Sequence, residues 1–171
     1  MAAESPTSHF TAEMLVTLEM FKDSPWEEPV PVSPFWDRIY ALQDELNLPE
    51  AEQTVRMLVD KTPYKLNPVP AHMLAEHLVN VGEYEEAERI ERPIRAWMAA
   101  WLYLGLSSPQ ALNARRLIAQ ALWGQGPSRR SEAEDLIAEI YWIVEEMGEG
   151  HFAVYQAEER RLNQVMMATL R

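Results

Sequence analysis

The sequence contains no cysteine, few basic residues and no long apolar run. The absence of cysteine excludes disulfide bonds, thiolate zinc sites and cysteine nucleophiles. Lys and Arg number 15 against 27 Asp and Glu, and the net charge of −12 repels phosphate backbones and anionic membranes. No run approaches the roughly 18 apolar residues that a membrane span requires. We therefore expect no nucleic-acid partner and no membrane association.

The remaining composition is that of an ordinary globular protein. Apolar residues make up 47% and charged residues 25% of the 171 residues, enough for one domain with a core. The opening MAAESPTSHF lacks the basic and apolar regions of a secretory signal. A cysteine-free chain also suits a reducing compartment. We expect a soluble, cytoplasmic protein.

Apolar residues recur at helical spacing, and no segment alternates as a strand does. Gly82 is expected to end one helix, and Ser108 and Ser131 to cap two others. Pro93 predicts a kink or break near Glu91. The sequence thus predicts an all-α fold of about eight helices, over residues 10–21, 34–46, 49–61, 70–81, 84–104, 109–123, 131–147 and 150–170.

The stretch around Gly82 has a pattern known from a repeat family. The residues that carry it are Leu74, Ala75, Leu78, Gly82, Tyr84 and Ala87. They resemble the tetratricopeptide repeat (TPR), in which small residues let two antiparallel helices cross closely and a glycine makes the turn. Two fainter copies flank it, one with Ala51, Val55, Leu58 and Pro63, the other with Ile118, Ala119, Leu122, Gly126 and Ala133.

The repeats are irregular in spacing and in sequence. The anchor alanines at 51, 87 and 133 lie 36 and then 46 residues apart, and the longer spacing is similar to that of kinesin light chains. Glu91 stands where the TPR motif prefers an aromatic residue, and Arg115 and Arg116 stand where the longer variety has two asparagines. Degenerate repeats and a look-alike α-hairpin fold both remain open.

The resemblance implies a short right-handed solenoid that covers most of the chain. Residues 1–33 would form an amphipathic helix and a proline-rich arm, and residues 34–171 the repeat domain. Its helix pairs would lie near 34–63, 68–104 and 108–147, with a capping helix at 150–170. The first helix of each pair would line a concave groove.

On these first helices, polar and aromatic residues three, four or seven apart share one face. Such a mixture suits recognition of a protein or peptide segment, with aromatic anchors and polar groups that fix register. The other interpretation is a solvated face with two partly buried tryptophans. The predicted groove residues are Trp36, Tyr40, Gln43, His72, Glu76, Asn80, Asn113, Arg116, Gln120 and Trp123.

Four arginines form the one dense basic cluster of this acidic chain: Arg115, Arg116, Arg129 and Arg130. They could clamp a carboxylate or phosphate of an acidic partner. We expect at least half of them to pair instead with Glu132, Glu134 and other nearby acids.

The proline-rich arm carries Trp26 next to Glu27 and Glu28. This segment is similar to the tryptophan-acidic peptides that kinesin-light-chain repeats bind. One hypothesis is that it docks in the groove of its own chain, or of a second copy in a homo-oligomer, facing Arg115 and Arg116. The other is that the tryptophan covers the first helix pair.

Few residues point to catalysis or to a metal. His72 and His77 lie five residues apart, so they diverge on a helix and do not form a metal-binding pair. The acids Glu83, Glu85, Glu86 and Glu88 are interpreted as the solvated first turn of a helix. We predict a non-catalytic interaction module without cofactor or metal. The alternative is an all-α enzyme or small-molecule-binding protein with a pocket between helices.

Overall fold

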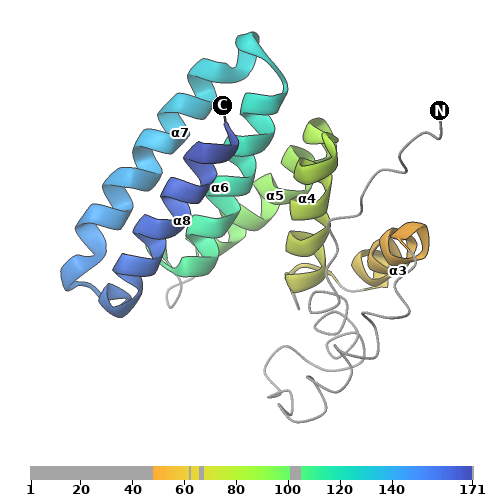
Figure 1. The fold of residues 1–171 in the computed structure, drawn as a ribbon. Helices are drawn as coiled ribbons and strands as arrows, with labels where there is room; N and C mark the ends of the chain where they lie inside the picture. Colours follow the sequence, from red (N-terminus) through yellow and green to blue (C-terminus); the bar gives the residue numbers. More distant parts are fainter. Residues whose placement is uncertain (1–47, 62, 66–67, 101–104, 171) are drawn as a thin grey trace. The chain divides into compact units, whose positions relative to one another are not determined.

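The structure, a computed structural model, describes residues 48–61, 63–65, 68–100 and 105–170. These residues form six α-helices and two short 3₁₀ helices, and contain no strand (Figure 1). The predicted helical class is therefore correct for this part of the chain. The predicted helices at 10–21 and 34–46 lie outside the described residues. The chain divides into two compact units, residues 1–81 and 82–171.

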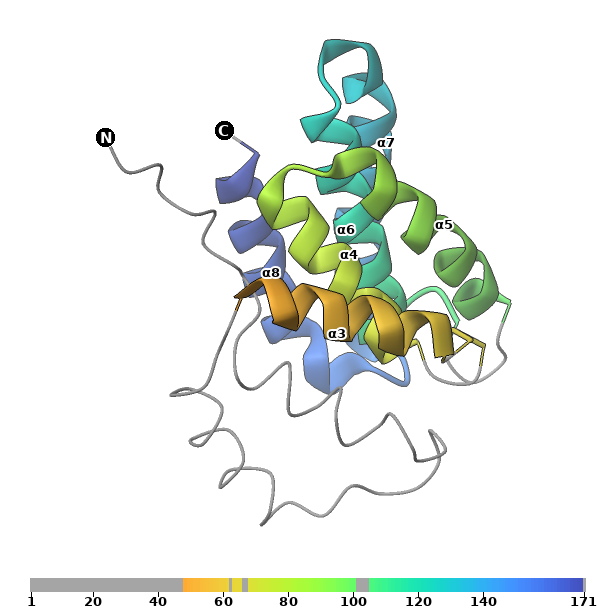
Figure 2. The ribbon, with the colours of Figure 1, turned by 90° about the vertical axis from the view of Figure 1, so that its right-hand side faces the viewer.

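In the first unit, α3 (Leu48–Lys61) packs across α4 (Val69–Val81), as Figure 2 shows. Val55 of α3 is fully buried, as are Ala75 and Leu78 of α4. A side-chain hydrogen bond of 3.1 Å joins His77 Nε2 to Glu52 Oε2 and ties the two helices together. Both helices begin and end within one residue of the predicted positions.

In the second unit, α6 (Pro109–Gly124) is the central helix. It packs against α5 (Tyr84–Ala99), α7 (Pro127–Glu146) and α8 (Gln156–Thr169). Residues 114–119 of α6 are buried without interruption because neighbours cover its whole circumference. The core of this unit contains Leu112, Ile118, Ala119, Leu122, Ala133, Ile140, Val144, Met166 and Leu170.

The turns of the second unit depend on a few specific residues. Gly82 and Gly126 adopt φ angles of +88° and +106°, which L side chains rarely take. Ser108 caps α6, since its Oγ accepts a hydrogen bond of 3.2 Å from the backbone N–H of Ala111. The predicted roles of Gly82 and Ser108 are confirmed.

Three predicted boundaries are wrong. Helix α7 begins at Pro127 and not after Ser131, because proline at the first helical position needs no N–H partner and its φ is already helical. Helix α5 ends at Ala99 and not at residue 104, and it continues through Pro93 without the break that was one of the two expected outcomes there. Pro93 is exposed, so water can reach the carbonyl that loses its donor. Helix α8 begins only at Gln156, after the 3₁₀ helices η1 (Met147–Glu149) and η2 (Ala153–Tyr155).

Candidate functional site

The first predicted groove helix with described residues is α4. Glu76 and Asn80 are exposed on it one turn apart, and His72 is half-buried. On the opposite side of the same helix, Leu74 and Leu78 are almost fully buried. Helix α4 therefore has exposed polar side chains on one face, while its opposite face is packed. Trp36, Tyr40 and Gln43 lie outside the described residues.

On α6, the middle of the predicted row is engaged by the C-terminal helix α8. Arg116 is buried; its Nη2 donates to Glu159 Oε2 at 2.6 Å and its Nε to Asn163 Oδ1 at 2.9 Å. Gln120 Nε2 donates to the hydroxyl of Thr169 at 2.9 Å. Arg116 thus lies inside the second unit, and the amide of Gln120 faces α8.

The two ends of the α6 row differ from its middle. Asn113 is exposed near the start of the helix. Trp123 is half-buried against the core of the second unit, and the guanidinium carbon of Arg130 lies 4.8 Å from the centre of its ring. This geometry fits a cation–π contact. Asn113 is therefore the most accessible member of the predicted row on α6.

Three of the four clustered arginines form ion pairs with glutamates. Arg115 pairs with Glu139, Arg116 with Glu159, and Arg129 with both Glu88 and Glu132. The interpretation that at least half of the cluster pairs with nearby acids is confirmed. Any partner that uses Arg115 or Arg116, including Glu27 and Glu28 of the arm, would have to displace these contacts.

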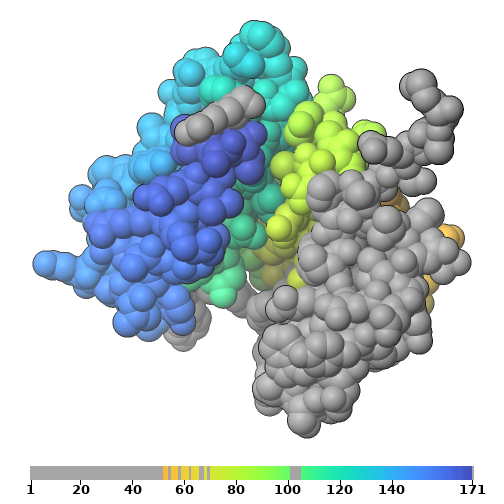
Figure 3. All heavy atoms as spheres, in the orientation of Figure 1, coloured from red at the N-terminus to blue at the C-terminus, as the bar shows by residue number. Residues whose placement is uncertain are grey.

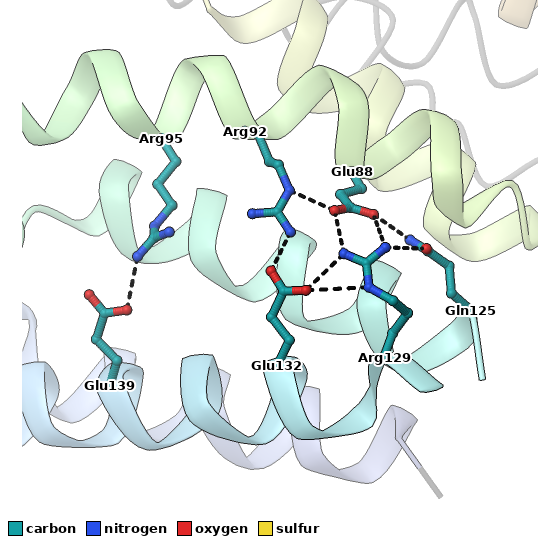
Figure 4. Close-up of polar contacts among 7 residues, drawn as sticks. All are labelled: Glu88, Arg92, Arg95, Gln125, Arg129, Glu132 and Glu139. Atoms are coloured by element: carbon teal, nitrogen blue, oxygen red, sulfur yellow. Dashed lines mark hydrogen bonds and ion pairs between the residues drawn. The ribbon is translucent and has the colours of Figure 1, made fainter. Parts of the chain in front are cut away.

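Alternating arginine and glutamate side chains connect α5 to α7 (Figure 4), and we call this set the ladder. Its members are Glu88, Arg92 and Arg95 of α5, Gln125 of the intervening turn, and Arg129, Glu132 and Glu139 of α7. Arg92 donates to Glu88 and to Glu132, both at 2.6 Å. Arg95 Nη2 donates to Glu139 Oε2 at 2.9 Å. The bond from Arg92 to Glu88 lies within α5, whereas those to Glu132 and Glu139 join α5 to α7.

Glu88 is the most strongly perturbed acid of the ladder. Burial raises its pKa, but hydrogen bonds from Gln125, Arg129 and Arg92 outweigh the burial and lower the pKa from 4.5 to about 2. Its side chain is 12% exposed, so Glu88 does not belong to the solvated first turn that the sequence predicts. Glu88 binds α7 to α5 as a carboxylate.

A pocket of about 160 Å³ opens beside the ladder. Its walls come from three helices of the second unit and the turn before α6. Burial, together with the charge of Arg95, lowers the pKa of Arg115 at the floor of the pocket, although Glu139 opposes this effect. The lining residues are Arg92, Arg95, Ala96, Ala99, Leu106, Arg115 and Glu139.

This pocket was not predicted from the sequence, although the sequence contains part of its pattern. Glu88, Arg92 and Arg95 follow an i, i+4, i+7 spacing, and Glu132 and Glu139 are seven apart, so each set occupies one helix face. The acids of the α5 segment also fit the first turn of a helix, which is the interpretation that local rules favour. That these two faces oppose each other follows from tertiary packing, which periodicity does not predict.

None of the histidines in the described part of the chain lines the pocket. His77 bonds to Glu52 in the first unit, and His151 stacks edge-on against Phe152 with ring centres 4.8 Å apart. Across the described ranges, no three His, Cys, Asp or Glu side chains gather as metal ligands. Nor is any helix there long and apolar enough to cross a bilayer.

No family model, curated protein or solved structure matches this chain.

Proposed function

We propose that this chain is a non-catalytic protein-binding module whose helix pairs stack as a short TPR-like solenoid in the cytoplasm. The polar row of α4, Glu76 and Asn80, would contact a segment of a partner protein or peptide. The observation that carries the proposal is that both side chains are exposed one turn apart on a helix whose opposite side is buried. A rigid helix face offers hydrogen-bonding groups at little cost in conformational entropy.

Burial at the motif positions supports the TPR-like part of the proposal. Ala75, Ala87, Ala119 and Ala133 have no exposed surface. In a TPR these small residues lie where helices cross closely, and a larger side chain would separate them. The ring of Tyr84 lies against Gly124 at the end of α6, as expected for an aromatic residue that packs over a turn.

We limit the proposed contact surface to predicted groove residues that no other helix engages. Arg116 and Gln120 are engaged by α8, so we leave them out of the proposed contact. Asn113 remains as an exposed member of the α6 row. The aromatic residues of the first pair and the proline-rich arm lie outside the described residues and stay predictions, as do an acidic partner and a homo-oligomer formed through the arm.

Comparing two double variants of the full chain tests the proposal. Glu76→Ala with Asn80→Ala removes the α4 row, whereas Glu134→Ala with Gln164→Ala makes the same charge change at exposed positions of α7 and α8. Proteins captured by the immobilised wild-type chain would be identified, and the affinity of a purified partner measured by calorimetry.

We expect at least about a fivefold loss of affinity for the α4 variant, because two polar contacts at an interface contribute about 1–3 kcal/mol together. The control variant should bind as the wild type does. Equal binding by all three proteins would contradict the proposed surface. Circular dichroism of each variant verifies that the helices are intact.

A further inference from the structure

The pocket beside the ladder contains more guanidinium groups than carboxylates. Arg92, Arg95 and Arg115 line it with a single acid, Glu139. Glu139 is shared, because its Oε2 accepts from Arg95 and its Oε1 from Arg115 at 3.3 Å. One carboxylate therefore accepts hydrogen bonds from two arginines. The third, Arg92, bonds to Glu88 and Glu132, which lie at the end of the ladder nearer Gln125.

Each of these arginines keeps N–H groups that no described residue accepts. Arg92 uses Nε and Nη2, Arg95 uses only Nη2, and Arg115 uses Nε and Nη1. Figure 4 shows the remaining Nη1 groups of Arg92 and Arg95 turned toward the space between the two side chains. Arg95 is 30% exposed, so a solute can reach this space. Guanidinium groups from two helices of the second unit, α5 and α6, thus line one opening.

We propose that this pocket binds one small oxyanion, a phosphate or carboxylate group, held between Arg92 and Arg95 with Arg115 beneath. Guanidinium groups suit this ligand because their planar N–H pairs match the spacing of two oxygens. The volume of about 160 Å³ is well below the 300–1,000 Å³ typical of sites for larger organic ligands. A single anionic group therefore fits, and a whole nucleotide does not.

Electrostatics favours an anion at this place despite the acidity of the chain. The four arginines of the ladder and pocket, Arg92, Arg95, Arg115 and Arg129, face three glutamates, Glu88, Glu132 and Glu139. Arg115 is only 1% exposed, and burial lowers its pKa; the charge of Arg95 adds to this effect, and Glu139 opposes it. A bound anion would offset the repulsion between these two cations. A phosphate dianion should gain more from this than a monovalent carboxylate.

This inference is independent of the proposed protein partner, which would bind on α4. The probes are inorganic phosphate and sodium acetate, each titrated into the full-length protein and followed by NMR of the arginine side chains. Sodium chloride keeps the ionic strength equal in all samples, because screening alone alters exposed ion pairs. Three variants accompany the wild type: Arg95→Gln, Glu139→Gln, and Arg161→Gln as a control.

Two of the variants should change the affinity for phosphate in opposite directions. Arg95→Gln removes the guanidinium that has the fewest N–H groups engaged by described residues, and should weaken phosphate binding about tenfold. Glu139→Gln removes the competing carboxylate and should tighten binding at least threefold. Because it also leaves Arg115 buried without its acid, its melting temperature should fall in chloride and recover in phosphate. Arg161, which pairs with Glu158 on α8, lies outside the pocket, so Arg161→Gln should bind as the wild type does.

Saturable binding of either probe that Arg95→Gln weakens supports the site, and the better probe identifies the anion class. The proposal is overturned if neither probe binds saturably, if Arg95→Gln and Arg161→Gln weaken binding equally, or if phosphate stabilises Glu139→Gln no more than it stabilises the wild type. Arg95→Gln keeps the test decisive if Glu139→Gln fails to fold, because Arg95 is partly exposed and its loss leaves Glu139 still paired with Arg115.

Discussion

Arg116 is a charged side chain held inside the second unit, 5% exposed, against Glu159 at 3%. Such a pair contributes little net stability, but removal of one partner leaves a buried charge that costs about 3–5 kcal/mol. We predict this loss of unfolding free energy for Glu159→Ala in urea titrations followed by circular dichroism. The double variant Arg116→Met, Glu159→Met should recover much of it.

The adjacent residue supplies a control. Glu158→Ala removes the partner of Arg161 in an exposed pair, and we expect a much smaller effect than at position 159. Similar losses at positions 158 and 159 would show that the Arg116 pair does not hold α8 to α6.

Glu88 gives the second unit a specific response to acid. Its folded pKa of about 2 is below the ordinary 4.5, so the carboxylate stabilises the fold above pH 4.5, and this stabilisation is lost as the pH falls toward 2. The difference corresponds to about 3 kcal/mol at most. Glu88→Gln should therefore be less stable than the wild type at pH 7, and the gap should close near pH 2.

Urea titrations between pH 2 and 7 measure this gap directly. Glu134→Gln is the matched control, since Glu134 is an exposed acid on α7 outside the ladder. A pH-independent difference between Glu88→Gln and the wild type would contradict the role assigned to the charge of Glu88.

At the scale of elements, α5 meets α6 where the ring of Tyr84 covers Gly124. Gly→Ala within a helix normally adds up to about 1 kcal/mol of stability. Here the new Cβ would strike the ring, and overpacking costs about 1–3 kcal/mol. We predict that Gly124→Ala lowers the melting temperature in the wild type but raises it or leaves it unchanged in a Tyr84→Ala background. Equal shifts in both backgrounds would exclude the contact.

Capping and turn residues in the sequence predicted some helix ends correctly and others wrongly, depending on whether neighbouring signals compete. Ser108 and Gly82 act through their own backbone neighbours, so sequence is enough to place them. At the start of α7, two local signals compete, and Pro127 at the first turn prevails over the capping tendency of Ser131. The burial of Arg116 could not be predicted, because it requires α8, more than forty residues later in the chain, to lie on α6.

At the scale of the whole molecule, the division at Gly82 predicts an independent second unit. The core cluster from Leu112 to Leu170 lies entirely within residues 82–171. Figure 3 shows the outer surface of this unit, coloured green to blue. We expect the fragment 82–171 to be helical and to unfold cooperatively, measured by circular dichroism during heating. A fragment that ends at residue 146 should unfold at lower temperature, because it loses Glu159, Met166 and Leu170.

The candidate sites also differ in whether a single helix or the packing of several helices creates them. The sequence predicted the exposed row of α4 because an amphipathic helix has only one face to bury. It did not predict the arginine-lined pocket, whose residues come from positions 92 to 139 and are brought together only when α5, α6 and α7 pack. A non-cooperative transition of the 82–171 fragment would mean that this packing also needs the first unit.

The ladder has a practical consequence for chemical labelling. Lysine occurs only at positions 22, 61 and 65, so every basic residue of the second unit other than His151 is an arginine. Amine-reactive cross-linkers and labels will therefore modify the first unit and leave residues 82–171 unmarked. Reagents directed at guanidinium groups, such as glyoxals, are the ones that can report on the ladder and on the pocket beside it.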